Sequence, residues 1–119
     1  MSENELILKT EKTFEEIKHI DEDGNEYWYA RELMLSLGYT KWGNFKGVIS
    51  KAIQSCENSN MSVIDHFAEV GKTVPMPSGA KPKIIEEYKL SMKNKQFWII
   101  WIVRNLVLIY SVLHKQTHY

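Results

Sequence analysis

Residues 28–56 place the tightest limits on how this chain can fold, because their apolar side chains recur at helical spacing on both sides of a glycine. Leu33, Met34 and Leu37 form one short apolar stripe. Gly38 follows at once, where a helix commonly ends on a residue that accepts a positive φ. The sequence therefore predicts a helix that closes at Gly38 and a second helix soon after it.

Thr40 is the expected N-cap of that second helix. Its apolar face is long and amphipathic, comprising Trp42, Phe45, Val48, Ile49, Ala52, Ile53 and Cys56. Only Lys41, Lys46 and Lys51 are charged between Glu32 and Glu57, so this helix is basic. Two short helices around a glycine turn are typical of a helix-turn-helix DNA-binding unit. A packed helical hairpin with a solvated lysine face has the same pattern, and both interpretations stay open.

Length and composition indicate one soluble domain: 119 residues, 44% hydrophobic and 25% charged. The single cysteine excludes an internal disulfide and fits a reducing cytoplasm. The formal net charge is zero, yet the charges are unevenly placed, since every Asp and Glu lies at or before Glu87. Any polyanion-binding surface must therefore be local.

Residues 1–13 are polar and predict a flexible N-terminal arm. Residues 17–20 and 26–29 predict two strands of a β-hairpin, because Asp23-Gly24-Asn25 is a strong turn signal between them. The acidic residues of this turn lack the alternating oxygen ligands of a calcium loop. We interpret them as a solvated acidic turn.

Residues 61–70 predict a short third helix with Ser62 near its start and Gly71 at its end. Residues 72–76 and 82–90 predict a second β-hairpin, whose first strand must be an edge or irregular because Pro75 and Pro77 cannot donate hydrogen bonds. Residues 70–85 lack acids and carry Lys72, Lys81 and Lys83. Two interpretations stay open: a basic wing beside the basic helix, or an edge protected against aggregation.

The apolar tail, residues 97–113, predicts a helix that is buried against the domain or a second copy. A membrane anchor is the weaker interpretation, because Arg104 and Asn105 fall in the middle of the segment. A strand is a further alternative. Taken together, the periodicities predict an α+β domain of two hairpins, two or three helices and a closing helix. Its predicted core is Ile20, Trp28, Leu33, Leu37, Trp42, Phe45, Ile49, Ile53, Phe67 and Leu90.

Several stretches in order resemble a known family: residues 14–39, the W-x-x-F-x-x-V-I-x-K-A pattern of residues 42–52, Cys56-Glu57-Asn58-Ser59, Asp65-His66-Phe67, Gly79-Ala80-Lys81 and Tyr88-Lys89-Leu90-Ser91. They are similar to the N-terminal domain of the DNA-damage-inducible protein D family, which is related to the Bro-N domains of antirepressor-like proteins. The resemblance implies a small α+β domain, DNA binding or regulation of DNA repair, no cofactor, and expression tied to DNA damage or phage biology.

Beyond Ser91 the tail departs from the family pattern. The expected organisation is therefore a flexible arm over residues 1–13, a domain similar to the family over residues 14–91, and an apolar closing helix over residues 92–119. The tail could also pair two copies of the chain.

The sequence carries no catalytic motif and predicts no enzyme and no metal site. Cys56 ends an apolar stripe and is expected in the core. Asp65 and His66 are adjacent on a predicted helix, so their side chains diverge. His114 and His118 are spaced for one helix face, but no acid or cysteine accompanies them.

Two functional classes remain: a nucleic-acid-binding module, or a module that binds a DNA-repair or repressor protein. A membrane-tethered domain is a third interpretation that depends on the tail. If the domain binds DNA, the predicted contact residues lie on the second helix and second hairpin: Lys41, Asn44, Lys46, Lys51, Lys72, Lys81 and Lys83. Asn44 is the candidate for a base edge, because an amide pairs bidentately with adenine.

Overall fold

The computed structural model describes residues 2–91, 93 and 95–107, without the side chains of residues 78, 106 and 107. The helices are α1 (Glu3–Ile17), α2 (Ala30–Ser36), α3 (Trp42–Asn58), α4 (Val63–His66) and α5 (Lys95–Ile102), with a 3-10 turn η1 (Pro77–Gly79) and a π-helical turn η2 (Val103–Val107). The predicted α+β class is confirmed.

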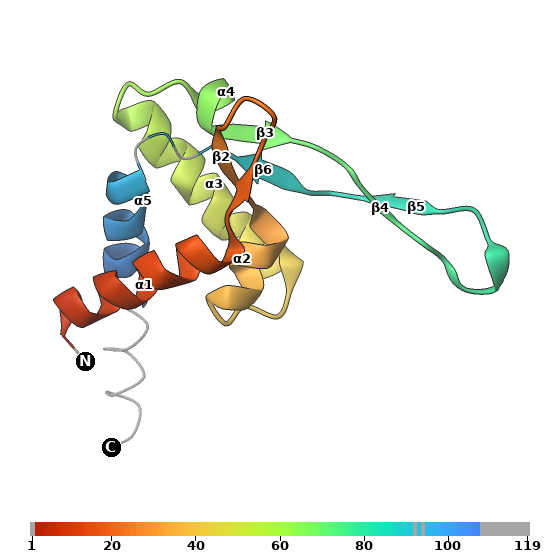
Figure 1. Cartoon of the computed structure of the whole chain (residues 1–119), viewed down its shortest axis with the longest axis horizontal. Coiled ribbons are helices and arrows are strands. Elements are labelled where there is room, and N and C mark those ends of the chain that lie inside the picture. Colours follow the sequence, from red (N-terminus) through yellow and green to blue (C-terminus); the bar gives the residue numbers. More distant parts are fainter. Residues whose placement is uncertain (1, 92, 94, 108–119) are drawn as a thin grey trace, which may run out of the picture.

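Two antiparallel sheets accompany these helices. Strands β1 (His19–Ile20), β2 (Glu26–Tyr29), β6 (Tyr88–Leu90) and β3 (Phe67–Glu69) lie side by side in that order. Strands β4 (Lys72–Val74) and β5 (Lys83–Ile85) pair only with each other in the described chain. Residues 71–86, which we call the arm, extend away from the helices (Figure 1). The remaining described residues form the body.

The flexible N-terminus predicted for residues 1–13 is wrong, because α1 begins at Glu3 and packs on the body. Ser2 caps it by accepting a hydrogen bond at Oγ from the Glu5 N–H at 3.1 Å. Leu6, Thr10 and Phe14 are buried at intervals of four residues along one helix face. Because Thr10 is polar, a search for apolar residues at helical spacing does not detect this buried face. The helix also runs to Ile17, which the sequence assigned to a strand.

The first hairpin is confirmed, and Asp21 organises its turn. Its Oδ1 accepts hydrogen bonds from the backbone N–H groups of Asp23 and Asn25, each at 2.9 Å. Gly24 has a φ of 82°, the conformation that glycine adopts without strain. The core assignment of Ile20 is wrong, since it pairs with Glu26 beside the turn and is 60% exposed.

The two helices around Gly38 are confirmed as α2 and α3. Gly38 has a φ of 87°, and the next N–H, that of Tyr39, donates to the Met34 carbonyl at 3.0 Å. The predicted cap at Thr40 is wrong. Lys41 is the N-cap of α3 and makes no side-chain capping bond.

The third predicted helix is shorter than expected. Helix α4 ends at His66, and Phe67 begins strand β3, where it pairs with Leu90 of β6. Gly71 therefore does not end a helix but begins the arm. A Cβ at Gly71 would lie 2.7 Å from Cγ2 of Ile84, so glycine permits the close approach of the two arm strands.

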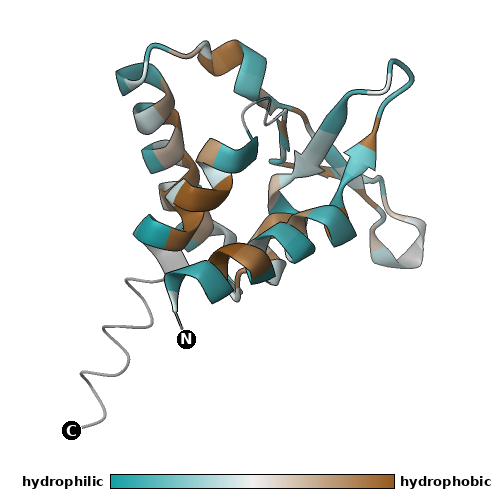
Figure 2. Ribbon diagram, turned by 60° about the vertical axis from the view of Figure 1, so that its left-hand side comes forward, coloured by the Kyte–Doolittle hydropathy of each residue, from teal (hydrophilic) through white to brown (hydrophobic). Residues whose placement is uncertain are grey.

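The core lies between the sheet and helices α1, α3 and α5, whose hydrophobic faces point inward (Figure 2). Of the predicted core, Leu37, Trp42 and Ile53 are partly buried, whereas six residues are buried as expected: Trp28, Leu33, Phe45, Ile49, Phe67 and Leu90. The predicted packing of the tail is confirmed for α5, where Trp98, Ile99 and Ile102 are buried. The rest of the predicted tail helix, residues 108–113, lies outside the described residues. Within the described chain, no helix is both long and apolar enough to cross a membrane.

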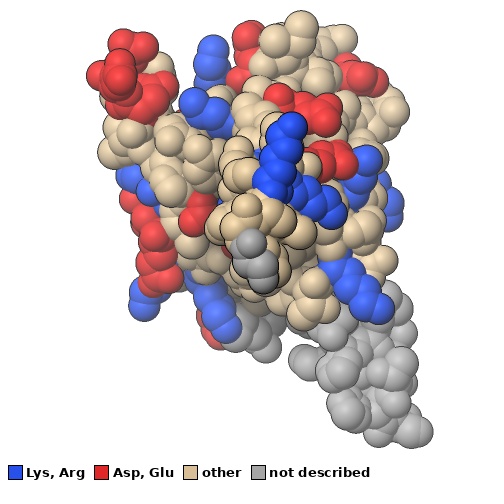
Figure 3. All heavy atoms as spheres, turned by 90° about the vertical axis from the view of Figure 1, so that its right-hand side faces the viewer, with Lys and Arg blue, Asp and Glu red and all other residues tan. Residues whose placement is uncertain are grey.

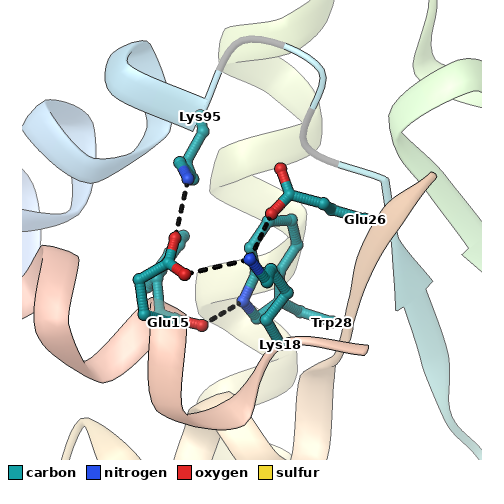
Figure 4. Close-up of polar contacts among 6 residues, drawn as sticks. Glu15, Lys18, Glu26, Trp28 and Lys95 are labelled. Carbon is teal, nitrogen blue, oxygen red and sulfur yellow. Dashed lines mark hydrogen bonds and ion pairs between the residues drawn. The ribbon is translucent and has the colours of Figure 1, made fainter. Parts of the chain in front are cut away.

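Polar contacts fasten the end of α1 to the rest of the body (Figure 4). Glu15 pairs with Lys18 at 2.9 Å and with Lys95 of α5 at 3.0 Å, while Lys18 also reaches Glu26 of β2 at 2.7 Å. Beneath them, Trp28 Nε1 donates to the Phe14 carbonyl at 2.9 Å. The ends of α1, β2 and α5 are therefore held together.

Candidate nucleic-acid interface

The arm presents three of the predicted contact lysines. Lys72 and Lys83 lie on β4 and β5, and Lys81 follows η1 near the end of the arm. In the register of the strands, Lys72 is opposite Ile85 and Lys83 is opposite Val74. Because opposite residues share a face, and so do residues two apart, Lys72 and Lys83 lie on the same face of the arm.

All three lysines are exposed, and none of the arm side chains that the structure describes is buried. Viewed from the end of the arm, basic side chains lie near the centre of the molecule, with acidic side chains of the rest of the chain beside them (Figure 3). No acidic residue occurs between Glu69 and Glu86. The arm is therefore a projecting element that carries three lysines against one acid, Glu86 at its base.

The predicted residues of α3 do not form one surface. Lys41, Asn44, Lys46 and Lys51 are all exposed. Successive helical residues turn by about 100°, so Asn44 and Lys51 lie on one flank of α3, while Lys46 lies about 140° away from Lys51. Lys46 is on the flank that meets the arm. The structure therefore places Lys46 beside the base of the arm and leaves Asn44 and Lys51 on another flank.

Lys46 makes an ion pair between α3 and the arm. Its Nζ pairs with Glu86 Oε2 at 3.1 Å, and both side chains are partly exposed. The hydrogen bond between them lowers the pKa of Glu86 and raises that of Lys46. No acidic residue lies near Lys46 in the sequence. In the folded chain, however, Glu86, which is forty residues further along, lies beside it. Lys46 is therefore partly neutralised.

Arg31 fixes the base of the arm to the helical pair. Its Cζ lies 4.3 Å from the centre of the Trp42 ring, and its Nε donates to the Glu86 carbonyl at 2.8 Å. Tyr88 also faces Trp42, with 6.3 Å between ring centres. Sequence reasoning missed Arg31, Glu86 and Tyr88, because only long-range contacts reveal their roles. Trp42 is half-buried in this group, in keeping with its place on the apolar face of α3.

The other chemical candidates take structural positions. Cys56 is buried, and this burial raises the pKa of its thiol. His66 is buried, and its Nδ1 lies 2.8 Å from the Ser62 carbonyl. The described residues contain no group of three or more side chains suited to hold a metal. His114 and His118 lie outside the described residues.

An antiparallel sheet packed on helices, with a basic arm beside it, defines a small α+β domain. Residues 16–102 match the model of the BRO family N-terminal domain (Bro-N), and the chain belongs to this family. Over 68 residues it is 44% identical to DNA damage-inducible protein D of Escherichia coli strain K12, a match that covers 57% of this chain and 25% of that protein. No solved structure matches the chain. The predicted family resemblance is confirmed.

Proposed function

We propose that this chain is a non-enzymatic regulatory domain of the DNA-damage response, or of an antirepressor-like system, that binds DNA through the arm and the adjoining flank of α3. The observation that carries this proposal is the arm itself. Lys72, Lys81 and Lys83 project from the body on a thin two-stranded element without an acid between them. Such an element can follow a groove or a phosphate backbone, as β-ribbons do in several DNA-binding proteins.

Family membership supports the regulatory class, since the similar Escherichia coli protein is named for induction by DNA damage. The residues proposed to contact DNA fall into two groups. The arm lysines, and Lys46 beside the base of the arm, are expected to bind phosphates. Lys41 at the start of α3, and Asn44 and Lys51 on its other flank, would contact DNA only if the duplex also lies along that flank. Asn44 remains the candidate for reading a base edge.

A second function is a protein-binding module that acts on a DNA-repair or repressor protein. The observation in its favour is that the arm also exposes apolar side chains, Met76 at 40% and Ile84 at 72%. An apolar interface of this kind resists added salt, whereas phosphate contacts weaken steeply with it.

The experiment measures binding of the full chain to labelled duplex and single-stranded DNA across a salt series. The full chain is needed because Trp98 and Ile99 of α5 are part of the core. The test variant combines Lys46→Glu with Lys81→Glu. The matched control combines Lys9→Glu with Lys12→Glu, two exposed lysines of α1 that undergo the same change of charge.

We expect the test variant to bind DNA more weakly and to show a shallower salt dependence, with the slope reduced by about one for each phosphate that the variant no longer binds. The control should bind as the unmodified chain does. Equal affinity and equal slope for the test variant and the unmodified chain would refute DNA binding through this surface, as would the absence of binding at low salt.

A further inference from the structure

A cleft of about 350 Å³ lies where the arm joins the body. It is lined by Tyr29 at the end of β2, Glu32 of α2, Gly71 and Lys72 at the start of the arm, and Glu87 before β6. Clefts of roughly 300–1,000 Å³ are the size that binds small ligands. Apart from Lys72, none of the proposed DNA contacts lines this cleft. The proposed DNA binding therefore does not use Tyr29, Glu32 or Glu87.

Glu87 is the buried polar group of the cleft, with 3% of its surface exposed. Its Oε1 accepts hydrogen bonds from the backbone N–H of Tyr88 at 2.9 Å and from that of Arg31 at 3.1 Å. These two bonds hold the carboxylate in a fixed orientation, because both donors belong to regular elements. A buried, oriented carboxylate in a cleft is suited to accept hydrogen bonds from a ligand.

The opposite side of the cleft is aromatic and also held in place. Tyr29 meets the rings of His19 and Tyr27 edge-on, at 5.0 and 5.5 Å between centres. Glu32 lies 2.6 Å from His19 Nε2. The interaction with Tyr27, together with burial and the nearby carboxylates, raises the pKa of Tyr29, which keeps its hydroxyl protonated. The cleft is thus lined by one aromatic ring, two carboxylates and, from the arm, one lysine.

We propose that this cleft binds an unpaired nucleobase of a single-stranded nucleic acid. The base would lie against the Tyr29 ring, with its amino edge toward the carboxylates of Glu32 and Glu87 and its phosphate near Lys72. Carboxylates accept from the exocyclic amine of cytosine, and aromatic side chains stack on unstacked bases. This inference rests on the proposed DNA binding and adds to it a preference for unpaired strands and for bases that carry an amino group.

The charges of the cleft favour a base over the two other ligand classes that such a site could take. Two carboxylates would repel a phosphate placed inside the cleft. A cation would be repelled by Lys72, which also lines the cleft. A neutral base with donor groups avoids both conflicts.

The test compares the binding of the full chain to oligo(dC) and oligo(dT) of equal length, at mildly alkaline pH. Cytosine presents an exocyclic amine, whereas thymine presents a carbonyl at the same position. We expect oligo(dC) to bind about tenfold more tightly, the scale of one good carboxylate–base contact. The test variant is Glu32→Gln, which keeps the size of the side chain, and the control is Glu69→Gln, on an exposed residue of β3.

Glu32→Gln should weaken the preference, because an amide oxygen is a weaker acceptor than a carboxylate. It should not change the salt slope, because the lysines that bind phosphates are all retained. Glu69→Gln should keep the preference. Equal binding of the two oligonucleotides, or a preference that Glu32→Gln leaves unchanged, would overturn the inference, as would displacement of oligo(dC) by free arginine from the same cleft. Binding of the nucleoside deoxycytidine, which has no phosphate, tests the cleft separately from the proposed DNA binding. If the chain binds no oligonucleotide but deoxycytidine shifts the NMR signals of Tyr29 and Glu32, the proposed function fails and the cleft assignment stands.

Discussion

The body and the arm differ in what their side chains do. The body buries a cluster of large apolar residues from α1, α3, α5 and the sheet, and Phe14, Trp28 and Trp98 are almost fully enclosed. The arm buries none of the side chains that the structure describes, and two strands of three residues are its only regular pairing. A two-stranded ribbon of this length has little stability of its own. The arm therefore depends on the body for its position.

This difference separates stability from recognition. A change in the body removes packing and alters the free energy of unfolding, whereas a change on the arm alters what the surface can bind. The contacts at the arm's base, Arg31 on Trp42 and Lys46 with Glu86, connect the two regions. Substitutions in each region can show whether the two are as independent as their burial indicates.

The largest expected effect is on stability. Trp98→Ala should lower the free energy of unfolding by about 3–5 kcal/mol, because it leaves a cavity in the core. Ile84→Ala on the arm, at a side chain that is 72% exposed, should change it by about 0.5 kcal/mol or less. Urea denaturation of both variants measures the contrast. Similar decreases for the two would show that the arm is part of the cooperative fold.

Substitutions on the arm are expected to change DNA binding but not stability. Replacing Lys72 and Lys83 together with alanine should reduce the slope of DNA affinity against salt by about two and leave stability within about 0.5 kcal/mol. Their shared face on the arm predicts that both contact the same phosphate backbone. A binding assay across salt, paired with thermal unfolding, checks both parts. Weaker binding that is accompanied by unfolding would contradict the separation of the two regions.

The sequence predicted those parts of the fold that local signals specify. Gly38 and Gly24 mark turns with positive φ, and the α3 stripe of Phe45, Ile49 and Cys56 gives the buried face. It failed where a decisive contact joins residues far apart in the chain. Residues 67–69 follow a helical pattern, yet pairing of β3 with β6 makes them a strand.

The candidate site shows the same limit. The lysines of the arm were found from charge alone, since a projecting hairpin brings few other elements near them. Lys46 appeared free of acids in the sequence, and only the fold places Glu86 beside it. The cleft was not foreseen at all, because Tyr29, Lys72 and Glu87 come from separate parts of the chain.

Helix α1 was the main error of the sequence analysis, and its cap offers a smaller test. Ser2→Ala removes the hydrogen bond to the Glu5 N–H and should lower stability by about 1 kcal/mol. Ser2→Gly should cost only a few tenths of that, since glycine is tolerated at N-caps. Thermal unfolding measures the difference. No effect of either variant would indicate that the first turn of α1 adds nothing to the fold.

The smallest expected effect concerns acid stability and the contact between α1 and α5. Hydrogen bonds from Lys18 and Lys95 lower the pKa of Glu15 in the folded chain below its ordinary value. A carboxyl with a lowered folded pKa stabilises the fold above its unfolded pKa, and this contribution disappears as the pH falls through the folded pKa. Glu15→Gln should therefore reduce stability at neutral pH and weaken its dependence on pH below about 4.5. Glu16→Gln makes the same change on the next exposed side chain of α1 and is the matched control. Denaturation midpoints across acidic pH measure both variants, and identical pH profiles would show that the Glu15 contacts with Lys18 and Lys95 do not contribute to the stability of the body.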